Sequence, residues 1–139
     1  VAGVLAARGS EHALVVHGGD RLDEITTTDL TRIYEVRDGE VISDTEFDPE
    51  SVGIRRANRA EIQGGSPEEN VRIMHELFSG TDTGPRADIV AINAAAGLLV
   101  AGVVDDLASG VDAAKEAMTN GRAAGQIAAV VDLSNEIAG

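Results

Sequence analysis

The first third of the chain carries short apolar runs of the length that strands have. Ala13 to Val16 is such a run, and it ends at His17-Gly18-Gly19, which is typical of a buried strand that leads into a loop. Two longer β-rich runs, 31–37 and 40–47, flank Asp38-Gly39. An Asp-Gly pair between such runs is a strong signal for a two-residue turn. We therefore expect one strand and one hairpin in this part of the chain.

From residue 48 onward the apolar positions recur at the spacing of helices. Ser66-Pro67-Glu68-Glu69 has the parts of a helix start, because serine caps, proline suits the first position and Glu69 can return the bond. The segment 89–104 is apolar apart from Asn93, which predicts a helix buried on nearly all sides. It is shorter than the roughly 18 to 20 residues that span a bilayer. Further helices are expected over 107–119 and 122–137.

The order of a strand, a hairpin and then helices predicts a mixed α/β unit over residues 1–139. Its parts are a strand and loop over 13–25, the hairpin over 31–47 and helices over 67–137. The strands are few for so many helices. We therefore expect the domain to be partial, with more of the sheet in chain that precedes Val1.

The composition fits a globular protein with an aliphatic core, since 43% of the residues are apolar and only 2% are aromatic. The chain has no cysteine, which excludes disulfides and thiolate metal sites. No segment has the pattern of a signal peptide, which favours the cytoplasm.

The charge balance is strongly acidic. The formal net charge is −13, and Lys115 is the single lysine among eleven basic residues. Such a surface repels nucleic acid and anionic membranes, so we expect neither as a partner. Acidic, lysine-poor surfaces are typical of halophilic proteins, whose repulsion is screened because the Debye length falls to roughly 3 Å at 1 M salt. An ordinary acidic protein is the alternative.

Asp23 and Glu24 are the first candidates for a functional site. They follow the predicted strand after a glycine-bearing loop, and loops at the carboxyl ends of strands are where α/β proteins bind ligands. Two adjacent carboxylates suit Mg²⁺, which takes one or two protein carboxylates and completes its shell with water and phosphate oxygens. Adjacent acids are also common on solvated surfaces, and the spacing alone leaves both interpretations open.

Other polar groups have a structural interpretation that is at least as good. His17 is a possible general base, but a lone histidine at a strand end is more often structural. Gly64-Gly65 could present N–H groups to an anion, although the acidic helix start beside it favours a tight turn. We expect ion pairing rather than phosphate binding from a basic cluster made of Arg55, Arg56 and Arg59. No nucleophile with a base beside it is visible, so we assign no catalytic residue.

Four segments of the chain together resemble anthranilate phosphoribosyltransferases, in the same order and over essentially the whole length. In the first, a Leu-Asp-Glu triplet follows a Val-His-Gly strand end. The segments are Leu14-Val15-Val16-His17-Gly18-Gly19-Asp20-Arg21-Leu22-Asp23-Glu24-Ile25, Gly64-Gly65-Ser66-Pro67-Glu68-Glu69-Asn70, Asp88-Ile89-Val90-Ala91-Ile92-Asn93-Ala94-Ala95-Ala96, and Ser109-Gly110-Val111 with Asn120-Gly121-Arg122-Ala123.

This resemblance implies a fold and an activity. The fold is the C-terminal portion of the large α/β domain of a nucleoside-phosphorylase/anthranilate-phosphoribosyltransferase-like protein, without the N-terminal helical domain. The activity is transfer of phosphoribosyl from phosphoribosyl pyrophosphate to anthranilate in tryptophan biosynthesis. By motif, Asp23 and Glu24 correspond to the pair that helps to hold Mg²⁺ on the pyrophosphate. A homodimer would form through the helical domain.

The sequence lacks other parts of the family's pattern. The glycine-rich phosphate loop, the Lys-His-Gly-Asn segment, the ribose-phosphate loop and the anthranilate-binding arginine segment all precede the strand at Ala13 in the family. We therefore expect the chain alone to be inactive. The alternatives are a phosphoribosyltransferase for another acceptor, a pyrimidine nucleoside phosphorylase-like enzyme, and a non-catalytic interaction module.

Overall fold

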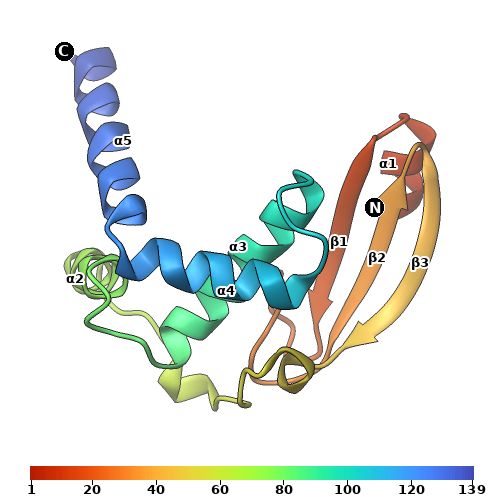
Figure 1. The fold of residues 1–139 in the computed structure, drawn as a ribbon, viewed down its shortest axis with the longest axis horizontal. Helices are drawn as coiled ribbons and strands as arrows, with labels where there is room; N and C mark the ends of the chain where they lie inside the picture. The colour runs from red at the N-terminus through yellow and green to blue at the C-terminus, as the bar shows by residue number, and fades with distance from the viewer.

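A three-stranded antiparallel sheet forms one end of the molecule, and helices form the other (Figure 1). The computed structural model describes all residues, 1–139. The strands are β1 (His12–Gly18), β2 (Thr31–Arg37) and β3 (Glu40–Phe47), and they lie in the order β1-β2-β3. The strand and the hairpin that the sequence predicts are thus confirmed, and β1 pairs with the hairpin directly.

The hairpin turn forms as its sequence predicts. Asp38 and Gly39 join β2 to β3, and both have positive φ, 49° and 79°. Positive φ at both central residues is the geometry of the turn that matches the twist of the flanking strands, and Asp-Gly adopts it readily. A register shift between Glu35 and Val36 marks a bulge, in which Ile42 of β3 is the extra residue.

The two faces of the sheet pack against different helices. Leu14 and Val16 of β1 and Ile33 of β2 pack into the main core with the helices that follow. On the other face, Val15 and Tyr34 lie beside the short helix α1 (Ala2–Ala7). The prediction that β1 is a buried strand was wrong in degree, because β1 is half-buried and pairs with a neighbour along one edge only.

The helices also follow the predicted order. Two short 3-10 turns, η1 (Pro49–Val52) and η2 (Arg59–Glu61), come first, and α2 (Pro67–Phe78) begins with the predicted capping box. The Ser66 hydroxyl accepts a hydrogen bond from the Glu69 amide, and the Glu69 carboxylate accepts one from the Ser66 amide. The remaining helices are α3 (Pro85–Val100), α4 (Leu107–Thr119) and α5 (Arg122–Ala138).

Helix α3 is the centre of the core. Its buried residues are Ala87, Ala91, Ile92 and Ala95, and α4 packs along it (Figure 1). The prediction of a helix buried on nearly all sides was wrong, because one face of α3, with Ala94 at its middle, is exposed. A uniformly apolar sequence does not indicate which of its sides the rest of the chain covers.

Helix α5 projects away from the other elements (Figure 1). None of its residues is buried, and several large apolar side chains are exposed, namely Val130, Val131, Leu133 and Ile137. None of the helices is both long enough and apolar enough to cross a membrane.

Candidate functional site

Two glycines allow the loop that follows β1 to lie close against other residues of the same loop. A Cβ on Gly18 would lie 2.6 Å from Oδ1 of Asp20, and one on Gly19 would lie 2.8 Å from Oδ2 of Asp29 and 3.1 Å from the carbonyl oxygen of Leu30. The Gly18 amide donates to the carbonyl of Leu22 at 2.9 Å, which closes a tight turn. The glycines therefore leave room for the carboxylates of Asp20 and Asp29 and for the backbone carbonyls beside them.

Asp20 organises the loop from its inner side. Its carboxylate accepts hydrogen bonds from the Leu22 amide at 3.2 Å and from the hydroxyls of Thr26 at 2.9 Å and Thr28 at 2.6 Å. Partial burial by itself raises the pKa of Asp20, but the bonds from Thr28, Leu22 and Thr26 outweigh burial and hold its pKa below the usual value. Asp20 is thus an ionised anchor at neutral pH.

Asn93 of α3 holds the other end of the loop. Its Oδ1 accepts a hydrogen bond from the Ile25 amide at 2.9 Å, and its Nδ2 donates to the carbonyl of Ile25 at 2.9 Å. Nδ2 also donates to the carbonyl of Ile89, one turn back in α3. Ile25 itself is fully buried in the core. The loop is therefore anchored both by packing and by a paired set of polar contacts.

Asp23 and Glu24 lie between these two anchors. Both side chains are exposed, and neither makes a hydrogen bond or an ion pair with another side chain of the chain. Two free carboxylates open to solvent match the donor set that Mg²⁺ uses when phosphate and water supply its other ligands. No group of three or more His, Asp or Glu side chains that could hold a metal ion exists in the protein, this loop included, so a cation here would need ligands from outside the chain.

The other candidates have structural roles. Arg55 pairs with Glu61 at 2.6 Å, and Arg56 pairs with Asp48 at 2.8 Å, so the predicted ion pairing is confirmed for these two arginines. Arg59 begins the turn η2 and takes part in no ion pair. His17 is exposed at the end of β1 and makes no hydrogen bond through its side chain.

Gly64 and Gly65 lie in an irregular segment that leads into α2, and no turn forms there. Asn70 Oδ1 accepts a hydrogen bond from the Gly65 backbone amide at 2.8 Å, and Asn70 Nδ2 donates one to the Gly65 carbonyl at 3.1 Å. The carboxylates of Glu68 and Glu69 occupy the start of α2, where they accept bonds from Ser66. An incoming phosphate would meet these negative charges first. The predicted helix cap is therefore confirmed, whereas the predicted tight turn is not formed.

No sequence pattern indicates the polar cluster that lies at the start of β1. His12 Nε2 lies 3.0 Å from Oε1 of Glu35, which also accepts a bond from Arg37 at 2.8 Å. The hydrogen bond from Arg37 is the main factor that lowers the pKa of Glu35, and that from His12 adds to it. The register of β1 against β2 creates this cluster, and a single strand sequence contains no signal for it.

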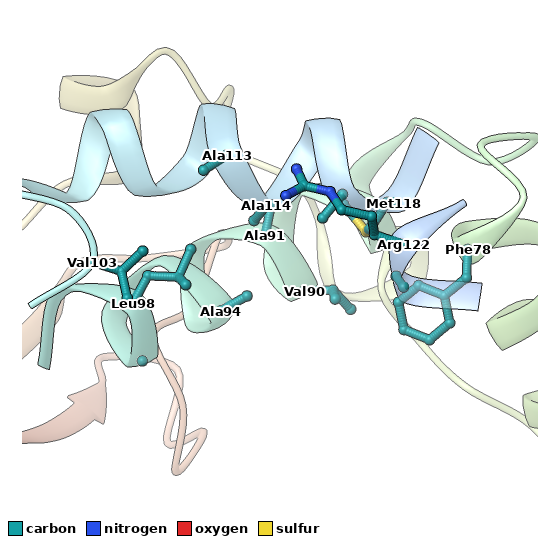
Figure 2. A pocket seen from close by; sticks show the side chains of 13 residues that line it. Phe78, Val90, Ala91, Ala94, Leu98, Val103, Ala113, Ala114, Met118 and Arg122 are labelled. Carbon is teal, nitrogen blue, oxygen red and sulfur yellow. The ribbon is translucent and has the colours of Figure 1, made fainter. Parts of the chain in front are cut away.

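An apolar groove lies along the exposed side of α3 and α4. Figure 2 shows Val90, Ala94 and Leu98 of α3 facing it together with side chains of α4, and Arg122 near one end. The groove has a volume of about 490 Å³, and eleven of its thirteen lining residues are hydrophobic.

The family follows from a comparison with known proteins. A family model described as "Glycosyl transferase family, a/b domain" matches residues 1–124. The chain belongs to this family. Curated family relatives include the anthranilate phosphoribosyltransferase of Acetivibrio thermocellus, 42% identical over 135 residues, which are 97% of this chain and 39% of the relative. The enzyme of Methanosarcina barkeri is 45% identical over 122 residues, 88% of this chain and 32% of that one.

Solved structures give the same fold. The crystal structure of anthranilate phosphoribosyltransferase from Thermus thermophilus matches 81% of this chain with a TM-score of 0.73 and 38% identity. The Saccharomyces cerevisiae enzyme, solved in complex with PRPP and Mg, matches the same share with a TM-score of 0.72 and 22% identity. This chain covers 32% of each of these structures, so it spans about a third of the proteins that it resembles.

Proposed function

We propose that this chain forms the carboxylate-bearing part of an anthranilate phosphoribosyltransferase. The reaction transfers phosphoribosyl from phosphoribosyl pyrophosphate to the amino nitrogen of anthranilate. The observation that carries the proposal is the pair Asp23 and Glu24, which is unpaired, exposed and held on an anchored loop. Identities of 42 to 45% with enzymes of that name support it.

The chemistry explains why such a pair is needed. The bond from the ribose carbon to pyrophosphate breaks as the bond to the anthranilate nitrogen forms, so negative charge grows on the leaving group. Bound Mg²⁺ neutralises that charge. Asp23 and Glu24 supply the negative side chains that retain the cation, and the anchored loop keeps them in one place. Fixed charges matter because the attraction between two mobile unit charges 4 Å apart in water is worth only about 1 kcal/mol.

The rest of the active site would come from the part of the relatives that this chain does not span. Two surfaces favour docking of that part. The apolar groove between α3 and α4 leaves Leu98 and Val103 accessible, and the outer edge of β1 has no neighbouring strand. We propose that the remaining two thirds of an anthranilate phosphoribosyltransferase cover this groove, because docking there would remove apolar surface from water.

A complementation assay tests the proposed function. The purified chain is mixed with the N-terminal two thirds of a related anthranilate phosphoribosyltransferase, and the loss of anthranilate fluorescence is followed with phosphoribosyl pyrophosphate and Mg²⁺ at high salt. We expect turnover in the mixture and none with either part alone. The contradicting result is a mixture that forms a complex but consumes no anthranilate.

The same samples separate the competing functions. Phosphate-dependent cleavage of a pyrimidine nucleoside by the complex, without Mg²⁺, would indicate a phosphorylase-like enzyme, since phosphorolysis has no pyrophosphate to neutralise. A complex with neither activity would indicate an interaction module.

A further inference from the structure

Asn93 acts on the peptide bond that adjoins the carboxylate pair. The Ile25 N–H belongs to the peptide unit that joins Glu24 to Ile25, and Asn93 Oδ1 accepts its hydrogen bond at 2.9 Å. The bond from Nδ2 to the Ile25 carbonyl, also at 2.9 Å, fixes the next peptide unit. Two consecutive peptide planes are therefore held by one side chain that lies 68 positions away in the sequence.

The opposite side of the pair is held in a different way. The Leu22 amide donates to Asp20 at 3.2 Å, and the Leu22 carbonyl accepts from the Gly18 amide at 2.9 Å. Asp23 and Glu24 are the two residues between these fixed points. Their backbone is thus tethered at both ends by hydrogen bonds, whereas their side chains are exposed to solvent.

Asn93 is also the one strongly polar side chain in the middle of α3. An apolar residue of similar size in place of Asn93 would fill the same space. It would, however, leave the Ile25 N–H and C=O without partners, and burying unpaired polar groups is unfavourable. Ile25 packs in the main core with Ile92, which precedes Asn93 in α3. Packing thus fixes the position of the Ile25 side chain, and Asn93 fixes the orientation of its backbone.

We propose that Asn93 is a positioning residue for the metal-binding pair Asp23 and Glu24. This inference rests on the proposed function. By holding the peptide between Glu24 and Ile25, Asn93 sets the direction in which both carboxylates leave the loop. A metal site gains affinity when its ligands are held in the bound geometry before the ion arrives. The side chain of Asn93 bonds only backbone groups of Ile25 and Ile89, so we do not assign it as a metal ligand.

Binding of Mn²⁺ in the presence of pyrophosphate, measured by electron paramagnetic resonance, tests this role on the 139-residue chain. We compare the native chain with Asn93→Leu, which removes all three bonds at similar size, and with Asn93→Ala, which leaves room for water beside the Ile25 peptide. We expect the dissociation constant to rise about tenfold or more in both variants, with faster hydrogen exchange at the Ile25 amide.

Asn70→Leu is the matched control, because Asn70 holds the backbone of Gly65 by the same pair of bonds far from the loop. It should change neither Mn²⁺ binding nor exchange at Ile25. The complemented enzyme is the complex of this chain with the N-terminal two thirds of a related anthranilate phosphoribosyltransferase. In it, Asn93→Ala should raise the Mg²⁺ concentration needed for half-maximal rate, and saturating Mg²⁺ should restore most of the rate. A merely structural role predicts a loss that Mg²⁺ does not restore.

The outcomes distinguish two failures. Equal Mn²⁺ binding by the native chain and both Asn93 variants would overturn the positioning role and leave the proposed function intact. Two results would overturn the metal site and the positioning role together. One is that the native chain does not bind Mn²⁺, and the other is that the double variant Asp23→Asn with Glu24→Gln binds it as well as the native chain does.

Discussion

Gly110 of α4 lies directly against Ala95 of α3. A Cβ on Gly110 would lie 2.7 Å from the Cβ of Ala95 and 3.0 Å from its Cα, so α3 and α4 approach to backbone contact at this point. Ala95 is fully buried. The close approach brings the two helices together along the core and so fixes the position of α3, which carries Asn93.

Replacing this glycine should separate the helices. We expect Gly110→Ala to lower the free energy of unfolding by about 1 to 2 kcal/mol, because overpacking costs more than the gain in helix propensity. Gly125→Ala is the control, since Gly125 is likewise the fourth residue of its helix but has open space around it. It should raise stability by about 0.5 to 1 kcal/mol. Urea unfolding measures both changes, and equal effects would contradict the close packing.

Local signals predicted much of this fold. The Asp38-Gly39 turn and the capping box at Ser66 depend on neighbouring residues, so the sequence alone was sufficient for the hairpin and the start of α2. The pairing of β1 with β2 and the contact between Asn93 and Ile25 depend on residues far apart in the sequence. No local pattern encodes such contacts.

The candidate site was predictable to the same extent. The glycine-bearing loop and its place after a strand pointed to Asp23 and Glu24, and the family resemblance gave them a role. Asp20 was not singled out, because its three hydrogen bonds arise only when the loop folds back on itself. The exposed face of α3 was missed because apolar composition does not reveal which neighbours are present.

Asp20 should make stability depend on pH in acid. Its folded-state pKa is lowered, so its contribution is complete above the unfolded value of about 3.9 and is lost as pH falls through the folded value. We expect the unfolding free energy of the native chain to fall more steeply below about pH 4 than that of Asp20→Asn. Thermal unfolding between pH 3 and 7 measures the difference, and parallel curves would contradict the ionised anchor.

The acidic surface predicts a dependence on salt. With a net charge of −13, repulsion between carboxylates opposes folding, and salt screens it. We expect helical circular dichroism to decrease on dialysis from molar salt into low salt and to return when salt is restored. An unchanged spectrum would contradict the halophilic interpretation of the composition.

The groove should be the surface on which the remaining two thirds of the enzyme dock. Ala94→Glu places a charge in the groove without replacing a buried side chain, because Ala94 is exposed. We expect binding of the N-terminal part, measured by calorimetry, to weaken at least tenfold. Ala108→Glu, on an exposed position of α4 outside the groove, is the control. Equal binding by both variants would contradict docking at this surface.

The most direct test concerns the carboxylates themselves. In the complemented enzyme, Asp23→Asn with Glu24→Gln is compared with Glu46→Gln and Asp105→Asn, two exposed acids without ion pairs whose replacement changes the net charge equally. Phosphoribosyl transfer to anthranilate is measured against Mg²⁺ concentration. We predict that the first variant folds normally and loses at least a hundredfold in rate, about 2.7 kcal/mol, while the control keeps the native rate. Equal rates in the two variants would contradict the assignment of Asp23 and Glu24 to the metal.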